Sequence, residues 1–279
     1  MFNQLPITRI KISIARILYK IVSPFIWKRT VIRRRNGINY ELDLTEGIDF
    51  SVFLFGNFQK HVTRSKYLNI PKDATIIDVG GNFGIMALQY AKIAENGKVI
   101  SFEPTHYALE KFKRNLDLNP NLKQRVQLIN AFVSHKKSDH PDIKAYSSWK
   151  INTITDNHHP VHLGTSKAAN GVGSVTLDDF CSENHLDKIN LIKIDTDGHE
   201  FEVFKGSKNA IATYRPTIIF EVGKYVMEEK NISFTFYLDY FHILNYKLID
   251  SKTNKKMDAH SWKKLIPSLG TTDVIAVPN

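Results

Sequence analysis

The stretch Thr75–Gly84, TIIDVGGNFG, decides the fold of this chain. Its apolar run ends at Asp78 and passes directly into a glycine-rich turn, the pattern of a buried parallel strand that opens into a ligand-binding loop. Ile85–Ile93 follows with the composition of a helix. A strand, a turn and a helix in this order predict the start of a doubly wound α/β sheet.

The spacing of the glycines selects the class of ligand. A dinucleotide-binding loop needs glycines at G-x-G-x-x-G, because its backbone amides approach a pyrophosphate. Counted from Gly80, the second and third glycine positions hold Asn82 and Ile85, and counting from Gly81 also fails. A carboxylate at Asp78 would in addition repel a phosphate. The sequence therefore disfavours a nicotinamide-dependent oxidoreductase.

The same carboxylate suits a cationic ligand. S-adenosylmethionine carries an ammonium group and a sulfonium and no phosphate, so its charge is complementary to a loop that begins with an acid. We predict that Asp78, Gly80, Asn82 and Gly84 bind this methyl donor.

A second apolar run, Val99–Phe102, ends in Glu103. The second strand of a doubly wound sheet lies beside the first, so we expect Glu103 to accept hydrogen bonds from the two ribose hydroxyls of an adenosine. A single acid at a strand end is also compatible with helix capping, but two acids at this spacing favour the cofactor site. A third strand within Arg125–Phe132 places Asn130 at its end, where we expect a contact with the adenine.

These segments and several later ones resemble the FkbM family of S-adenosylmethionine-dependent methyltransferases. The motifs DVGGNFG, FEP, KRNLDLN, VTLDDF and LIKIDTDGHEFEVFKGS follow in the order of that family and cover most of the chain. In the family form I-D-V-E-G-x-E, this chain has Thr196 and Asp197 instead of Val and Glu, whereas Gly198 and Glu200 keep their places. The resemblance implies a Rossmann-like class I methyltransferase sheet with a terminal antiparallel hairpin. It also implies O-methylation of a sugar, glycolipid or related metabolite.

The remaining elements follow the alternation of strands and helices that βαβ units produce. We divide the chain into a basic N-terminal extension at residues 1–36 and a methyltransferase domain at residues 37–279, with a variable insertion at residues 134–173. The other expected elements are a short strand or hairpin at Gly37–Leu44, helices at Asp49–Leu68, Ala108–Leu118 and Met227–Leu244, strands at Asn190–Asp195 and Thr217–Val222, and the terminal hairpin of Tyr246–Ser251 and Asp273–Pro278.

Asp195 and His199 are the candidates for the catalytic base. Asp195 ends a predicted parallel strand and His199 follows one turn later, in the crevice where open α/β sheets bind ligands. A hydroxyl must lose its proton as it attacks, so a positioned base adds about 10²–10⁴-fold to the rate, and a histidine has a suitable ordinary pKa of about 6.5. A divalent metal on Asp195, Asp197 and Glu200 is a disfavoured alternative, because helix capping explains two of these acids.

The acceptor is constrained by what the sequence lacks. Amino-group methyltransferases that act on nucleobases carry N/D-P-P-Y/F where this chain has Asp195-Thr196-Asp197-Gly198, so we do not expect a nucleic-acid substrate.

The polar insertion is predicted to contact substrate. A non-catalytic module that binds an acidic glycan, a membrane surface or RNA is the alternative. Five histidines of the insertion have no metal-ligand spacing and are predicted as loop residues: His135, His140, His158, His159 and His162.

The net charge of +10 is concentrated near the N-terminus, where nine basic residues and no acid lie between Arg9 and Arg35. This segment predicts an amphipathic helix that either packs on protein or lies on an anionic membrane. No apolar run is long enough to span a bilayer and no signal peptide is recognised, so we expect a cytoplasmic protein. The lone Cys181 excludes an internal disulfide. The predicted apolar face consists of Ile10, Ile14, Ile17, Leu18, Ile21 and Phe25.

Overall fold

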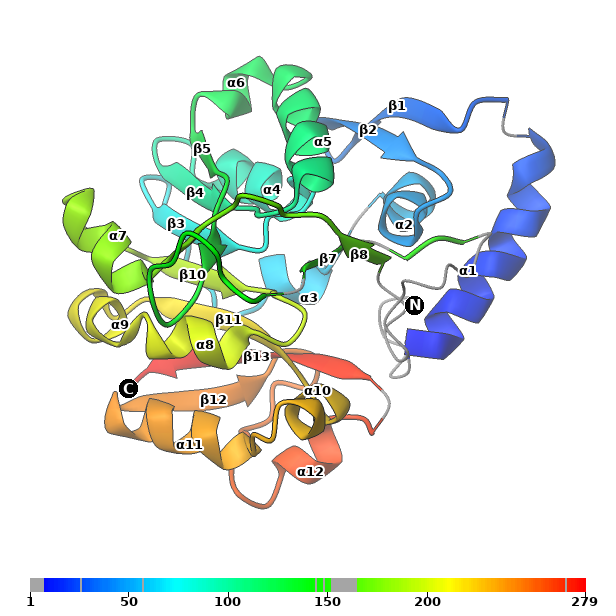
Figure 1. The fold of residues 1–279 in the computed structure, drawn as a ribbon. Coiled ribbons are helices and arrows are strands. Elements are labelled where there is room, and N and C mark those ends of the chain that lie inside the picture. Colours follow the sequence, from blue (N-terminus) through cyan, green and yellow to red (C-terminus); the bar gives the residue numbers. More distant parts are fainter. Residues whose placement is uncertain are drawn as a thin grey trace.

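A mostly parallel sheet forms the centre of the computed structural model, which describes residues 8–25, 27–56, 58–143, 145–147, 149–151, 165–268 and 270–279 (Figure 1). In the described part of the chain the sheet has seven strands in the order β12-β13-β11-β10-β3-β4-β5. All neighbours are parallel except β13, which is antiparallel to both β11 and β12. The strands are β3 (Thr75–Val79), β4 (Lys98–Phe102), β5 (Val126–Ile129), β10 (Leu191–Ile194), β11 (Thr217–Gly223), β12 (Tyr246–Asp250) and β13 (Thr271–Pro278).

The strand order reverses beside β3, which confirms the predicted α/β sheet. The chain leaves β3 towards β4 and β5 and later returns to the other side of β3 through β10 and β11. A ligand-binding crevice forms at such a reversal, outside the carboxyl ends of the strands. The turns after β3, β4, β5 and β10 therefore meet at one edge of the sheet.

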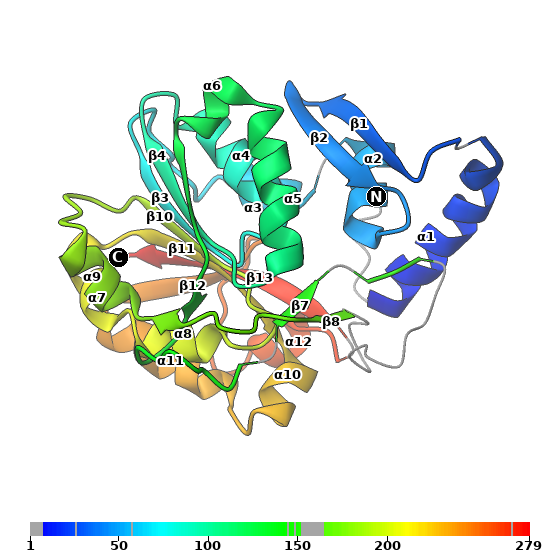
Figure 2. The same cartoon turned by 45° about the horizontal axis from the view of Figure 1, so that its top comes forward.

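Helices cover both faces of the sheet (Figures 1 and 2). One apolar core lies between the sheet and α7–α11, where the ring centroids of Phe204 and Phe220 are 4.9 Å apart and those of Phe220 and Phe241 are 5.4 Å apart. The other lies under α4, α5 and the N-terminal elements and includes Phe112. These helices are α4 (Ile85–Ile93), α5 (His106–Asp117), α6 (Pro120–Lys123), α7 (Leu177–Glu183), α8 (Glu200–Lys205), α9 (Lys208–Tyr214), α10 (Lys224–Glu229), α11 (Phe234–Ile243) and α12 (Trp262–Leu265).

Two predicted helices are each divided in the structure. The segment Asp49–Leu68 forms α2 (Gly47–Phe55) and α3 (Lys60–Thr63), because Gly56 ends α2 in the left-handed conformation with φ 66°. Met227–Leu244 is divided between α10 and α11, with Asn231 at φ 53° between them. Glycine and asparagine adopt positive φ at little cost, so both are natural helix ends.

The N-terminal elements begin with α1 (Thr8–Val22) and η2 (Ser23–Phe25) and continue into an antiparallel hairpin of β1 (Thr30–Arg35) and β2 (Ile38–Asp43). Asn36 and Gly37 join the two strands with φ of 50° and 81°, the backbone of a tight hairpin turn. The predicted division at residue 36 thus falls inside the hairpin. Among the described residues no helix is long and apolar enough to cross a membrane.

A buried ionic cluster fastens these elements to the sheet domain. Lys111 of α5 forms salt bridges with Asp49 and with Glu46, the latter at 3.2 Å. Lys150 lies 2.8 Å from Glu46 and 3.5 Å from Asp43. We call this group the N-terminal cluster, and its members are Asp43, Glu46, Asp49, Arg29, Lys111 and Lys150.

The insertion begins and ends at one short parallel pair, β6 (Phe132–Val133) with β9 (Ser174–Val175). Between them β7 (Ala145–Ser147) pairs antiparallel with β8 (Thr165–Lys167). Of its histidines, His158, His159 and His162 lie outside the described residues. His135 contacts Glu202 of α8 at 2.5 Å.

Candidate functional site

The glycine turn after β3 has a backbone that requires its small residues. Gly80, Asn82 and Gly84 have φ of 84°, 48° and 87°. A Cβ on Gly80 would lie 1.9 Å from the carbonyl oxygen of Asp195, and one on Gly84 would lie 2.3 Å from the ring of Phe112. The turn therefore fits closely between the end of β10 and helix α5, and it keeps a backbone-lined edge at the crevice.

Gly81 is a part of this turn that the sequence reasoning missed. A Cβ there would lie 2.2 Å from Ser101 Oγ on the neighbouring strand. Gly80 and Gly81 both donate backbone hydrogen bonds to the carbonyl oxygen of Phe102, at 3.0 and 2.9 Å. The available signal was the second glycine of the Gly80-Gly81 pair: Gly81 does not have a positive φ, so its lack of a side chain indicates close packing against a neighbouring strand.

Glu103 joins the turn after β4 to the glycine turn. Its Oε2 accepts the amide of Asn82 at 2.8 Å, and its Oε1 accepts the amide and hydroxyl of Thr105 at 2.8 and 2.5 Å. Burial raises the pKa of Glu103, while these hydrogen bonds favour the charged form. A carboxylate has about four acceptor positions, so one position on Oε2 is left for a ligand. The expectation of two ribose hydroxyls is thus reduced to one.

Asp78 does not reach the crevice directly, which corrects the expected contact with the cofactor. It is fully buried, accepts a hydrogen bond from Ser101 at 3.0 Å and lies 3.5 Å from Lys193 Nζ. The strand register sets these three residues side by side on β4, β3 and β10. Burial raises the pKa of Asp78, and the charge of Lys193 opposes that shift. Asp78 therefore links β3 to its two neighbouring strands.

Lys193 is the second residue that sequence reasoning missed. It is only 4% exposed, and its Nζ lies 3.3 Å from the carboxylate of Asp195. The charges of Asp195 and Asp78 raise the pKa of Lys193 against the opposing effect of burial. A lysine within the apolar run LIKI was the available signal, because a buried lysine requires an acidic partner.

Asp195 stands at the tip of β10, as predicted. Its backbone amide donates to the carbonyl of Val79 at 3.0 Å, which places the residue beside the glycine turn. Its side chain is 25% exposed, so the carboxylate is open to the crevice.

Further acids surround Asp195. Burial and the charges of Asp195, Glu200 and Glu103 raise the pKa of Asp197 well above its ordinary value. Burial and the charges of Asp195 and Asp273 do the same to the pKa of Glu221. Negative charge thus exceeds positive charge at this edge of the sheet. We call this group the strand-tip cluster, and its members are Asp78, Glu103, Asp195, Asp197, Glu221 and Lys193.

Glu200 turns towards its own loop. Its Oε1 accepts the amides of Thr196 and Gly198 at 2.9 and 3.2 Å, at the start of α8. In the described part of the chain there is no group of three or more side chains that could hold a metal ion. The observed role of Glu200 is to brace the loop that carries Asp195 and Asp197.

His199 immediately precedes α8. The pKa of its imidazole is lower than the ordinary value on which the sequence-based expectation relied. Burial and the charge of Lys230 lower its pKa from 6.5 to about 4, against the opposing charge of Glu202. The ordinary histidine pKa used in the sequence argument is therefore wrong for this position. A base with so low a pKa drives proton transfer less well near neutral pH.

Asn130 follows β5 and extends the crevice on the side of Glu103. Its amide nitrogen donates to the carbonyl oxygens of Glu103 and Pro104 at 2.9 and 3.1 Å. This pairing holds the side chain, and the amide oxygen is the acceptor that it can offer to a ligand.

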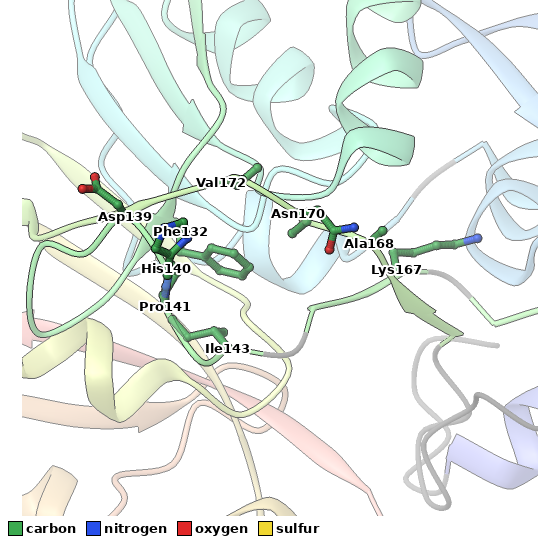
Figure 3. A pocket seen from close by; sticks show the side chains of 11 residues that line it. Phe132, Asp139, His140, Pro141, Ile143, Lys167, Ala168, Asn170 and Val172 are labelled. Atoms are coloured by element: carbon green, nitrogen blue, oxygen red, sulfur yellow. The ribbon is translucent and has the colours of Figure 1, made fainter.

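A cavity of about 320 Å³ lies between the segment after β5 and the segment that joins β8 to β9 (Figure 3). Phe132, His140, Lys167 and Asn170 are among the residues that line it. His106, the first residue of α5, lies 3.2 Å from the carbonyl oxygen of Asn170. The cavity therefore adjoins the strand tips and is bounded by the insertion.

Comparison with known proteins identifies the family. The profile described as "Methyltransferase FkbM domain" matches residues 78–248, well over half of the chain. The chain therefore belongs to the FkbM methyltransferase family, as its sequence motifs predicted. The matched region begins at Asp78, near the end of β3, and includes β4, β5, β10 and β11, and with them the strand-tip cluster.

Three curated relatives align with about half of this chain. Methyltransferase 1 of Beauveria bassiana is 29% identical over 147 residues (49% of this chain, 59% of the relative). Hexuronic acid methyltransferase AglP of Haloferax volcanii is 24% identical over 148 residues (53% and 56%). The 2-O-methyltransferase NoeI of Sinorhizobium fredii is 25% identical over 152 residues (51% and 61%). The matches thus span less than two thirds of each relative.

Among solved structures, the methyltransferase FkbM of Methylobacillus flagellatus is similar to 75% of this chain. The similarity covers 44% of that protein, with a TM-score of 0.46 and 16% sequence identity.

Proposed function

We propose that this protein transfers a methyl group from S-adenosylmethionine to a hydroxyl group of a sugar, glycolipid or related metabolite. The excess of acids in the strand-tip cluster carries the proposal, because it provides a negative site for a cationic methyl donor. The glycine turn lacks the register of a phosphate-binding loop. The names of AglP and NoeI, a hexuronic acid methyltransferase and a 2-O-methyltransferase, support a sugar acceptor.

The residues present fit the cofactor. One acceptor position on Glu103 is left for a ribose hydroxyl, and the amide oxygen of Asn130 suits an amino group of the adenine. The partly exposed carboxylate of Asp195 supplies negative charge for the ammonium and sulfonium groups. When bound, the cofactor supplies a methyl group that is already activated for displacement.

The chain's own task is to align the acceptor and to remove its proton. Alignment of the reacting atoms supplies roughly 7–11 kcal/mol in favourable cases. The bound cofactor would supply the methyl carbon to the hydroxyl oxygen and keep the electron pair of the broken carbon–sulfur bond on sulfur, and a base of this chain would take the hydroxyl proton. We assign this base to Asp195, which is partly exposed and lies beside the buried Lys193. His199 is the second candidate: its lowered pKa of about 4 makes it no stronger a base than an ordinary carboxylate, and its imidazole does not lie at the tip of β10.

A labelled methyl-transfer assay tests the proposal. The full chain is incubated with methyl-tritiated S-adenosylmethionine and a panel of neutral oligosaccharides and oligosaccharides that contain hexuronic acid. We expect label in a sugar that withstands mild alkali, as a methyl ether does and a methyl ester does not. Asp195→Asn should reduce the rate about 10²–10⁴-fold, the usual contribution of a positioned base. The matched control, Glu110→Gln on the exposed face of α5, should keep the rate.

Two results would contradict the proposal. Alkali-labile label would indicate methylation of a carboxyl group. Tight binding of the cofactor or of an acidic glycan without transfer to any acceptor would favour the non-catalytic module.

A further inference from the structure

Helix α1 has apolar residues on two faces, and the described part of the chain buries one of them. On the inner face Ala15 is 3% exposed, and the ring of Tyr19 meets that of Phe50 of α2 edge-on, with centroids 5.3 Å apart. On the outer face Ile17 and Ile21 are 59% and 61% exposed. Packing on its own domain explains the inner face alone.

The outer apolar face continues beyond the helix. Phe25 and Trp27 follow it and are 79% and 97% exposed. We call Ile17, Ile21, Phe25 and Trp27 the α1 surface. Large exposed apolar groups that gather in one short segment mark an interaction site, whereas scattered ones need no explanation.

Basic side chains accompany these apolar groups. Lys20, Lys28, Arg33 and Arg34 are exposed, and no acid lies in the segment from Arg9 to Arg35. Aromatic and aliphatic side chains with lysine and arginine beside them are the composition of segments that bind at membrane interfaces.

We propose that the α1 surface docks this protein on an anionic lipid bilayer. The apolar side chains enter the headgroup region, and the basic side chains contact lipid phosphates. A second copy of the chain is a poor occupant, because its own basic segment would meet this one with like charge. Figures 1 and 2 show α1 at the periphery of the fold, where a flat surface can reach it.

The docked helix is tied to the insertion. Arg16 Nε donates to the carbonyl oxygen of Ile151 at 3.1 Å, and the amide of Ile151 donates to the carbonyl of Thr45 at 2.8 Å. Docking through α1 would therefore place the bilayer on the side of the molecule where these residues of the insertion are anchored.

Vesicle flotation with the full chain tests the proposal. Phosphatidylcholine vesicles with and without phosphatidylglycerol are compared at low and high ionic strength. We expect binding only to the anionic vesicles, weakened by salt. The double variant Ile21→Glu, Trp27→Glu should bind at least about tenfold more weakly, since it removes two large apolar groups from the interface. Ile243→Glu is the matched control, because this isoleucine is 71% exposed at the end of α11.

The charges have their own test. Each basic side chain near an anionic leaflet changes binding by about fivefold, so Lys20→Gln with Lys28→Gln, two exposed lysines next to Ile21 and Trp27 in the sequence, should weaken it by about twenty-five-fold. The emission of Trp27 should shift to shorter wavelength on anionic vesicles, and this shift should be absent in Trp27→Phe. That conservative variant keeps the aromatic anchor and should still float with the vesicles.

Three outcomes would overturn the proposal. The first is a folded wild-type protein that does not bind anionic vesicles. The second is an equal loss of binding in Ile243→Glu. The third is a dimer in light scattering that Trp27→Glu dissociates, which would assign the surface to a second copy of the chain.

Discussion

The N-terminal cluster and the strand-tip cluster are both ionic and, apart from the exposed Arg29, largely buried, but their charges are balanced differently. The first has three acids and three cations, joined by salt bridges. The second has five acids, and Lys193 is its cation. Burial raises the pKa of Asp49 in the first cluster to about 7, but the charge of Lys111 opposes that shift. In the second cluster neighbouring acids add to the effect of burial on the pKa values of Asp197 and Glu221, and this arrangement destabilises the fold unless a cation binds.

This difference separates a structural cluster from a ligand site. Natural sites retain costly arrangements where function needs them. Removing a charge from the balanced cluster should therefore destabilise the protein, whereas removing an acid other than the partners of Lys193 from the unbalanced cluster, such as Asp197, should not.

The largest effect is expected for Lys111→Met, which leaves the buried Asp49 without its cation and leaves Glu46 with Lys150 alone. Breaking a buried ion pair from one side costs about 3–5 kcal/mol, so the free energy of unfolding in urea should fall by that amount. Lys113→Met is the control, because this lysine of the same helix is 54% exposed in its pair with Glu110. Equal losses in both variants would refute the structural role of the cluster.

A second effect concerns pH. The pKa of His199 is lowered to about 4 in the folded protein, so between pH 4 and its ordinary value of 6.5 the unfolded chain binds more protons. Stability should therefore fall as the pH is lowered through this window, by about 3 kcal/mol in total. His199→Gln should remove this part of the pH dependence. Urea titrations at several pH values measure it, and parallel curves for both proteins would contradict the buried, neutral imidazole.

A smaller effect of opposite sign is expected for Asp197→Asn. Asp197 has φ of 52°, which asparagine tolerates, and burial and its acidic neighbours raise its pKa. The variant should gain roughly 1 kcal/mol of stability at neutral pH, as substitutions at strained functional sites do. It should also bind S-adenosylmethionine about tenfold more weakly, a loss of about 1.4 kcal/mol. Loss of stability in thermal unfolding would show that this acid is structural.

The smallest effect is expected for Glu110→Gln. Its pair with Lys113 is solvent-exposed on both sides, and such pairs contribute little to stability. The midpoint of urea unfolding should stay nearly unchanged. A large shift of this midpoint would contradict the account, because it would show that a solvent-exposed ion pair contributes as much to stability as a buried one in this protein.

The sequence predicted the sheet and its glycine turn because both depend on local patterns. Apolar strands that end in Asp78, Glu103 and Asp195 follow a short-range rule, and so does the turn that begins at Gly80. The family motifs also gave the order of these segments, which the profile match confirms.

The sequence did not predict contacts between distant segments. Ser101, Asp78 and Lys193 lie side by side because of the register of β4, β3 and β10. This arrangement buries the carboxylate of Asp78, which was expected to face the ligand. The lowered pKa of His199 depends on Lys230 and on local burial, neither of which is visible in the motif. Breaks at Gly56 and Asn231 were visible, but helical composition on both sides concealed them.

Isothermal titration with S-adenosylmethionine tests the central claim most directly. Wild type is compared with Glu103→Ala and with Glu110→Ala on the exposed face of α5; Asp78→Ala is avoided because it would leave Lys193 buried with one acid fewer. The account predicts micromolar binding that Glu103→Ala weakens at least about tenfold and Glu110→Ala leaves unchanged. A folded wild-type protein that does not bind, or a Glu103→Ala variant that binds as well as wild type, would contradict it.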